Sequence, residues 1–170
     1  IFDDFRGQGV PEGQKSIAIE VTLQPGEKSY TEDELKAIAD KMTAAAAKDS
    51  VEFIQEEMEE IAGGPVAIPW DVEGADILLI HNAGEILAWP ENVGAFAILF
   101  QAAGLSWTLS SEAAGYDAVN YGLWYDDVQL ARVALRHADI ARRLKVKKIV
   151  LGECGHAHKA LTVIADRVLT

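Results

Sequence analysis

The residues best suited to chemistry follow an apolar run near the end of the sequence. Residues 147–161 read KKIVLGECGHAHKAL, where a predicted strand ends at a turn that holds the single cysteine, Cys154, with His156 and His158 close behind it. Ligands of open α/β sheets bind beyond the carboxyl ends of strands, so a site is expected here. Thiolate and imidazole groups are ligands for zinc or iron, and a thiol at a helix start can act as a nucleophile with His156 as its base.

A simpler interpretation makes Cys154 a buried, inert thiol. His156 and His158 are two residues apart at a predicted helix start, so their side chains point in roughly opposite directions and do not converge on one metal ion. The default prediction is therefore that the two histidines cap the turn. A metal site at Cys154 and a nucleophilic Cys154 remain as alternatives, and no residue is assigned as catalytic.

A second predicted strand ends in polar residues of the same kind. The apolar run ADILLI is typical of a strand buried on both faces of a parallel sheet, and His81 and Asn82 follow it directly. If the two strands are neighbours in the sheet, both polar turns face one cleft. The alternative is that His81 and Asn82 only turn the chain, as asparagine readily does. The candidate cleft comprises His81, Asn82, Glu85, Glu153, Cys154, His156 and His158.

Hydrophobic periodicity predicts an α/β fold in two parts. Residues 1–48 read as two strands and a helix that starts at a capping box of Thr31 and Glu34, and a second helix is expected from Asp49 onwards. After residue 65, strands alternate with helices, which indicates βαβ units with right-handed crossovers. Strands are expected at 66–68, 75–80, 107–109 and 149–151, and helices at 93–103, 127–144 and 156–169. The domain boundary is therefore placed between residues 48 and 49.

Charge and composition restrict the partners and the location. The 170 residues carry a formal net charge of −12, and a field of this sign repels phosphate backbones. Nucleic acid is therefore disfavoured as a partner, and basic proteins or cations are favoured. No apolar run approaches the roughly 20 residues that span a bilayer, so no membrane segment is expected. A single cysteine excludes an internal disulfide and fits the reducing cytoplasm.

Two runs in the first 48 residues carry a resemblance to a known domain. IFDDFRGQGVPEGQKSIAIEVTLQ and YTEDELKAIADKM resemble the second half of the ferredoxin-like anticodon-binding domain of the phenylalanyl-tRNA synthetase beta subunit. The resemblance implies a β-α-β-β-α-β sandwich, of which a β-β-α piece is present here. In that family the domain contacts the tRNA anticodon region, whereas the local charge of −3, from 6 basic and 9 acidic residues, disfavours RNA binding by this piece.

Two longer runs lie in residues 49–170. ADILLIHNAGEILAWPENVGAFAILFQAAGLSWTLSSE and GYDAVNYGLWYDDVQLARVALRHADIARRLKVKKIVLGECGHAHKAL resemble a CCG-domain iron–sulfur oxidoreductase of the heterodisulfide-reductase-like type. The resemblance implies a Rossmann-like domain with cysteine ligands for a [4Fe-4S] cluster. Only Cys154 matches such a ligand, because Ala83, Ala113 and Ala114 stand near the other positions. The resemblance therefore implies a domain without a cofactor of its own.

These observations lead to one expected function and two alternatives. The leading expectation is a portion of an electron-transferring iron–sulfur oxidoreductase that acts as a cluster-free scaffold or docking domain. Its partner would be a missing cluster-bearing domain or a redox protein. The alternatives are a tRNA-binding module related to the phenylalanyl-tRNA synthetase beta subunit, and an engineered or recombined chimera without native activity. The chain is not expected to be catalytic on its own.

Overall fold

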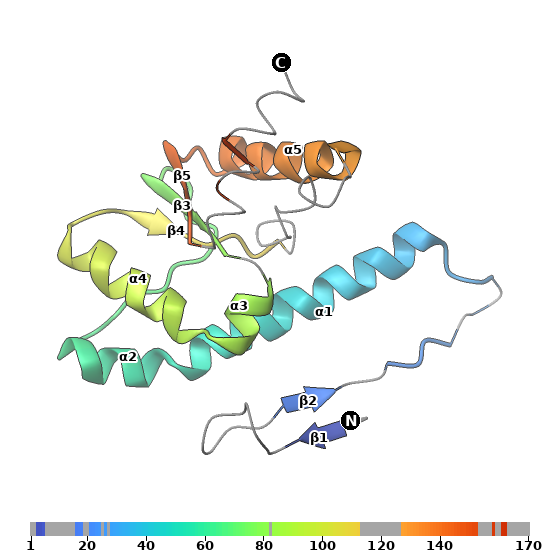
Figure 1. Cartoon of the computed structure of the whole chain (residues 1–170), viewed down its shortest axis with the longest axis horizontal. Helices are drawn as coiled ribbons and strands as arrows, with labels where there is room; N and C mark the ends of the chain where they lie inside the picture. Colours follow the sequence, from blue (N-terminus) through green and yellow to red (C-terminus); the bar gives the residue numbers. More distant parts are fainter. Residues whose placement is uncertain are drawn as a thin grey trace. The chain divides into compact units, whose positions relative to one another are not determined.

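The structure is a computed structural model, and it describes residues 3–5, 16–18, 21–24, 26, 28–81, 83–112, 127–152, 158 and 161–162. The chain forms two compact units, Ile1–Leu35 and Lys36–Thr170. The elements of both units, coloured along the sequence, are drawn in Figure 1. Within the described ranges, no helix is long and apolar enough to cross a membrane.

The first unit contains a two-stranded hairpin and the start of a helix. β1 (Asp3–Phe5) pairs antiparallel with β2 (Ser16–Ala18), and Asp4 lies opposite Ile17. The predicted capping box is confirmed, since the amide of Thr31 donates to Glu34 Oε2 at 2.8 Å and the amide of Glu34 donates to Thr31 Oγ1 at 3.2 Å. These hydrogen bonds, the one from the Thr31 amide first, hold the pKa of Glu34 below its ordinary value.

The helix that begins at this capping box is longer than expected. α1 (Glu32–Phe53) runs for 22 residues without interruption, so the predicted helix start at Asp49 is wrong. The helix is interrupted instead at Ile54, and α2 (Gln55–Ala62) follows. α2 ends at Gly63, whose φ of 69° lies in the left-handed region that favours glycine. The domain boundary between residues 48 and 49 stays a prediction, and it falls inside α1.

A parallel three-stranded sheet forms the centre of the second unit. Its strands β3 (Ile77–Ile80), β4 (Trp107–Thr108) and β5 (Lys148–Leu151) lie in the order β4-β3-β5. The predicted α/β fold class with a parallel sheet is thus confirmed. The strand predicted at 66–68 is wrong, because that segment has no strand structure and only Trp70 forms an isolated bridge, to Leu109.

Helices cover both faces of this sheet. α3 (Ala83–Ala88) and α4 (Glu91–Ala102) follow β3, and α5 (Asp127–Arg143) precedes β5. Since β4 and β5 flank β3 on opposite sides, right-handed connections place their helices on opposite faces. Figure 1 shows α5 on one side of the sheet and α4 with α2 on the other. The helix expected at 156–169 lies almost wholly outside the described residues.

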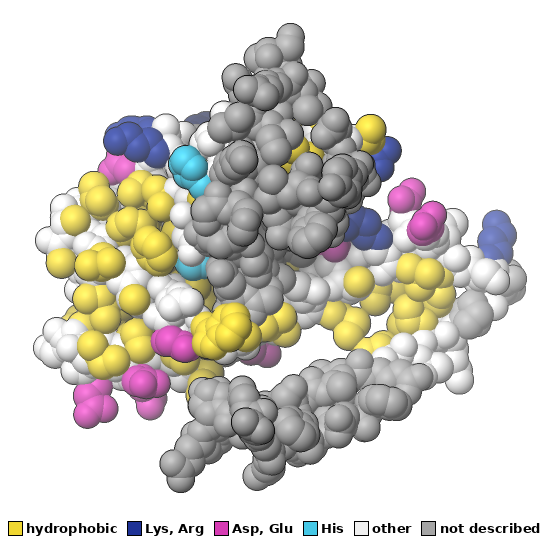
Figure 2. Space-filling view, in the orientation of Figure 1, with side chains coloured by type: hydrophobic (Ala, Val, Ile, Leu, Met, Phe, Trp, Pro, Cys, Tyr) yellow, Lys and Arg dark blue, Asp and Glu magenta, His cyan; other side chains and the backbone are white. Residues whose placement is uncertain are grey.

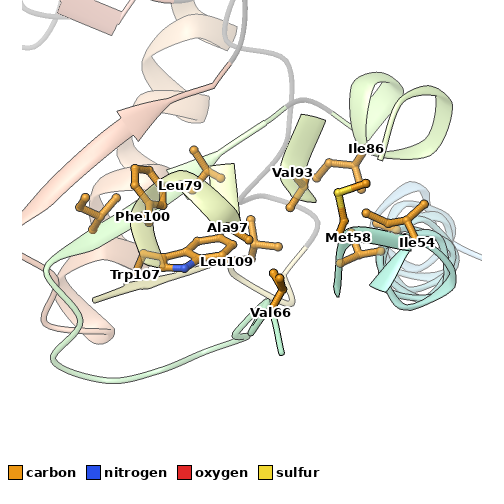
Figure 3. Close-up of a cluster of buried hydrophobic side chains, with 13 residues drawn as sticks. Ile54, Met58, Val66, Leu79, Ile86, Val93, Ala97, Phe100, Trp107 and Leu109 are labelled. Atoms are coloured by element: carbon orange, nitrogen blue, oxygen red, sulfur yellow. The ribbon is translucent and has the colours of Figure 1, made fainter. Parts of the chain in front are cut away.

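Alternate residues of β3 serve two separate hydrophobic cores. Ile77 and Leu79 join the larger core with side chains of α1, α2 and α4, whereas Leu78 and Ile80 pack with Ile140 and other residues of α5. Figure 3 shows side chains of the larger core, including Leu79. A strand with both faces covered explains why its sequence is a continuous apolar run.

The larger core depends on one close helix contact. A Cβ atom at Gly94 of α4 would overlap the side chain of Met58 in α2, so the glycine lets the two helices approach. Figure 3 shows Met58 beside Ile54 and facing the helix that carries Val93. α4 is therefore held against α2 on one side and against the sheet on another.

Candidate functional site

The two strand ends that carry the predicted site are neighbours in the sheet. Ile80 of β3 lies opposite Leu151 of β5, and the amide of Gly152 donates to the carbonyl of Ile80 at 2.9 Å. His81 and Gly152 thus follow adjacent strands at the same edge. The strand order reverses here, because β4 lies on one side of β3 and β5 on the other. In open α/β sheets such a switch point is the usual place for a ligand site.

His81 is enclosed at this edge. Its side chain is 1% exposed and meets the ring of Phe96 edge-on, with 5.4 Å between ring centroids and 69° between ring planes. A Cβ atom at Gly152 would overlap the imidazole ring of His81, so this ring lies directly on the backbone that follows β5. The structure therefore brings His81 next to Gly152, the described residue of the second predicted turn, and His81 is a packed side chain there.

The other residues of the candidate cleft are only partly described. His158 is exposed, and its carbonyl accepts a hydrogen bond from Thr162 Oγ1 at 2.8 Å. Within the part of the chain that is described, no group of three or more His, Cys, Asp or Glu side chains could hold a metal ion. A metal site at Cys154 stays a prediction. Outside the described residues lie Asn82, Glu153, Cys154 and His156, together with the side chain of Glu85.

A polar cavity that the sequence did not indicate lies beside α5. Its volume is about 460 Å³, and a second cavity of about 300 Å³ shares Glu112 and Arg143 with it. Glu112 and Arg143 form an ion pair, and Lys36 pairs with Asp40 at 3.4 Å. Cations and carboxylates are equal in number in the larger lining, so it favours neither anions nor cations. The larger cavity is lined by Lys36, Asp40, Glu112, Arg136, Asp139, Ile140 and Arg143.

Asp76 connects the starts of all three strands at the opposite edge of the sheet. Its Oδ1 accepts from Lys147 Nζ at 2.6 Å, just before β5, and its Oδ2 accepts from Ser106 Oγ at 2.7 Å, just before β4. The Lys147 hydrogen bond first, and then that of Ser106, lowers the pKa of Asp76. Close by, the carboxylate of Glu73 raises the pKa of Lys145.

Asp76→Asn is expected to destabilise the fold at neutral pH. A lowered folded-state pKa means that the ionised carboxylate stabilises the fold above its unfolded value near 3.8 and that this contribution is lost as pH falls through the folded value. Urea midpoints should therefore be lower for the variant at neutral pH, by a small amount because the pair is exposed, and should converge with wild type in acid. Glu60→Gln, at an exposed carboxylate, is the control. Equal midpoints for wild type and Asp76→Asn at neutral pH would refute the role of this carboxylate.

Comparison with known proteins places one similarity at the start of the chain. Residues 1–53 match the family model of the ferredoxin-fold anticodon binding domain. A phenylalanine–tRNA ligase beta subunit of Novosphingobium aromaticivorans is 71% identical over 53 residues, which are 31% of this chain and 7% of that protein. The corresponding subunit of Zymomonas mobilis is 58% identical over 48 residues, or 28% of this chain and 6% of that protein.

These relatives are much longer than the part they share with this chain. The beta subunit of Brucella abortus, 42% identical over 50 residues, likewise shares 29% of this chain and 6% of its own length. The chain thus matches less than a tenth of the length of these relatives. No solved structure matches the chain.

The matches correct the leading functional expectation. The expectation of an electron-transferring iron–sulfur oxidoreductase is wrong, because the matched family model is an anticodon-binding domain and the matched relatives are tRNA ligase subunits. The resemblance of residues 49–170 to a CCG-domain protein receives no support. The expectation of a redox partner, with nucleic acid disfavoured, is corrected by the same match to an anticodon-binding family. The similarity to the phenylalanyl-tRNA synthetase beta subunit that was predicted for residues 1–48 is confirmed, and the match extends to residue 53.

Proposed function

We propose that this chain contacts tRNA through residues 1–53, as part of an anticodon-binding module. The observation that carries the proposal is the 71% identity of these residues to a phenylalanine–tRNA ligase beta subunit, together with their match to the anticodon-binding family. The antiparallel pair β1–β2 and the capped start of α1 are consistent with a β-β-α piece of such a domain. Catalysis by this chain alone is not part of the proposal.

In this proposal the hydrophobic core of the second unit holds the last turns of α1 in place. Ala47 and Val51 are 0% and 1% exposed, and both belong to the core built around Leu79. The last turns of the matched segment are thus held by packing against a sheet that lies outside the match. A fixed helix reduces the conformational freedom that the segment would lose on binding RNA.

Cations within residues 1–53 would provide the attraction to tRNA phosphates. Arg6, Lys15 and Lys28 precede α1, and each phosphate contact of this kind makes binding depend on salt through counterion release. Because the whole chain carries −12, we expect the affinity to be modest and to fall quickly with added salt. The proposal places the chain beside tRNA in the cytoplasm and needs no cofactor, and both points remain predictions.

The double variant Arg6→Glu/Lys15→Glu is expected to bind phenylalanine tRNA about tenfold more weakly than wild type at low salt, because two phosphate contacts become repulsive. Fluorescence anisotropy with the full chain and labelled tRNA, repeated as salt is raised, measures the loss. Wild type should also show the steeper salt dependence.

The matched control is Arg132→Glu/Lys148→Glu, which changes the net charge equally at two exposed side chains outside residues 1–53. It should bind as wild type does. No binding by wild type at any salt concentration, or an equal loss in both double variants, would contradict the proposal. Circular dichroism of each variant confirms that the fold is intact.

A further inference from the structure

Positive charge is absent from nearly half of the sequence. Between Lys48 and Arg132 there is no lysine or arginine, although this stretch holds 15 of the 27 aspartates and glutamates. It includes α2, the sheet strands β3 and β4, and the helices α3 and α4. The surface formed by these elements therefore has carboxylates with no basic side chain of its own segment to neutralise them.

The outer side of α4 is apolar, which is unusual for a helix that covers a sheet. Its inner side packs Val93, Ala97 and Phe100 into the core, and surface helices normally turn polar residues outward. Here Leu99 is 63% exposed on the outward side, and Leu105, just beyond the helix, is 42% exposed. We call this surface the α4 face. It consists of the exposed residues Ala95, Leu99, Ala102 and Leu105.

Few polar groups interrupt the α4 face. The side-chain amide of Gln101 is turned to the carbonyl of Pro65, to which it donates at 2.9 Å. Ile61 at the end of α2 adds another apolar side chain that is 65% exposed. Figure 2 shows hydrophobic side chains gathered over α4 at the left of the view. Contiguous apolar surface of this kind marks protein interaction sites more often than chance exposure does.

Unpaired carboxylates border the α4 face. α2 packs against α4 through Met58 and Gly94, and it exposes Glu56, Glu57 and Glu60. None of these three forms a salt bridge within the described part of the chain. Figure 2 shows acidic side chains at the lower edge of the apolar area, over α2. The surface thus combines an apolar centre with an acidic rim.

We propose that the α4 face is a docking surface for a basic amphipathic helix of another protein. Apolar side chains of that helix would cover Leu99 and its neighbours, and its lysines or arginines would pair with the α2 carboxylates. A second copy of the chain would bring the same acidic rim and a net charge of −12, so the charges oppose self-association. Nucleic acid would be repelled for the same reason, and tRNA contact by residues 1–53 is independent of this surface.

The probe is a labelled helical peptide of leucine on one face and lysine on the other, about 18 residues or five turns long. We expect the full chain to bind it, to bind a leucine–glutamate peptide of the same pattern at least about tenfold more weakly, and to lose affinity with salt. Leu99→Glu should reduce binding of the leucine–lysine peptide at least about tenfold, since a charge would be buried. Leu135→Glu, at a leucine 48% exposed on α5, is the matched control and should bind normally.

A second variant tests the rim independently. Glu56→Gln/Glu57→Gln/Glu60→Gln keeps the side-chain size and should weaken peptide binding and flatten its salt dependence. Equal binding of the two peptides, an unchanged affinity of both variants, or an equal loss in Leu135→Glu would overturn the proposal. Sedimentation could instead show that the wild-type chain is a dimer and that Leu99→Glu makes it a monomer. This result would also overturn the proposal, because a second copy of the chain would then occupy the α4 face.

Discussion

Leu79→Ala is expected to lower the free energy of unfolding by about 2–5 kcal/mol, because it removes buried methyl groups and leaves a cavity. Leu79 is 1% exposed on the central strand, where it belongs to the core shared by α1, α2 and α4. Figure 3 shows it among the side chains of that core. Urea denaturation, followed by tryptophan fluorescence, measures the change.

Leu99→Ala is the matched control for this result. It removes the same atoms from a leucine that is 63% exposed, so its effect should stay within about 0.5 kcal/mol. Similar losses for the two variants would show that β3 is not the centre of the core. A large loss for Leu99→Ala alone would show that α4 turns its other side to the sheet.

Gly152→Ala is expected to destabilise the fold by about 1–3 kcal/mol, because the added methyl group enters space that the His81 ring occupies. The ring is buried against Phe96, so it cannot swing into solvent without disturbing that contact. Urea denaturation gives the loss, and the NMR signals of the His81 ring should shift. Gly64→Ala is the control, since a Cβ atom there meets nothing within 4 Å.

A double variant separates this contact from a general effect of alanine at position 152. In His81→Ala/Gly152→Ala the methyl group no longer meets an imidazole ring, so the cost of the glycine substitution should largely disappear. The two substitutions are then non-additive, as expected for residues in contact. Additive losses would mean that His81 and Gly152 do not touch.

The sequence was sufficient to predict the central sheet. ADILLI predicted a strand covered on both faces, and β3 packs its alternate side chains into two cores. The strand before Gly152 was also predicted, and the two strands are neighbours as the candidate cleft required. These predictions succeeded because continuous apolar runs between helical segments are a strong signal for parallel strands.

The helix boundary could not be predicted in the same way. Asp49 and Glu52 form a good capping pattern, but residues 48–53 contain no glycine or proline that would end the helix that begins at Glu32. The break occurs at Ile54, whose φ of −89° and ψ of −4° remain close to helical. Tertiary packing of Ile54 and Met58 against α4 accompanies this break, and packing over such distances is invisible to local patterns.

The enclosure of His81 was also beyond the sequence. Its position after an apolar strand indicated a polar turn, and the candidate cleft followed from that. Burial of the ring depends on Gly152, which is distant in sequence and comes alongside only through the register of β3 and β5. The functional expectation failed for a different reason, since a negative net charge, −12 for the chain and −5 for the matched residues 1–53 (6 basic and 11 acidic), does not show where individual cations lie.

α1 has a consequence for any attempt to divide this protein. The family match ends at residue 53, yet Ala47 and Val51, within that match, fill the interior of the unit that follows it. A fragment that ends at residue 53 would expose the apolar side of α1 to solvent. A fragment that begins there would lack two core side chains and leave a cavity in the core. The matched segment and the core of the second unit therefore share one helix, α1. Exchange of this segment between proteins must preserve small or branched side chains at the buried positions of its last turns.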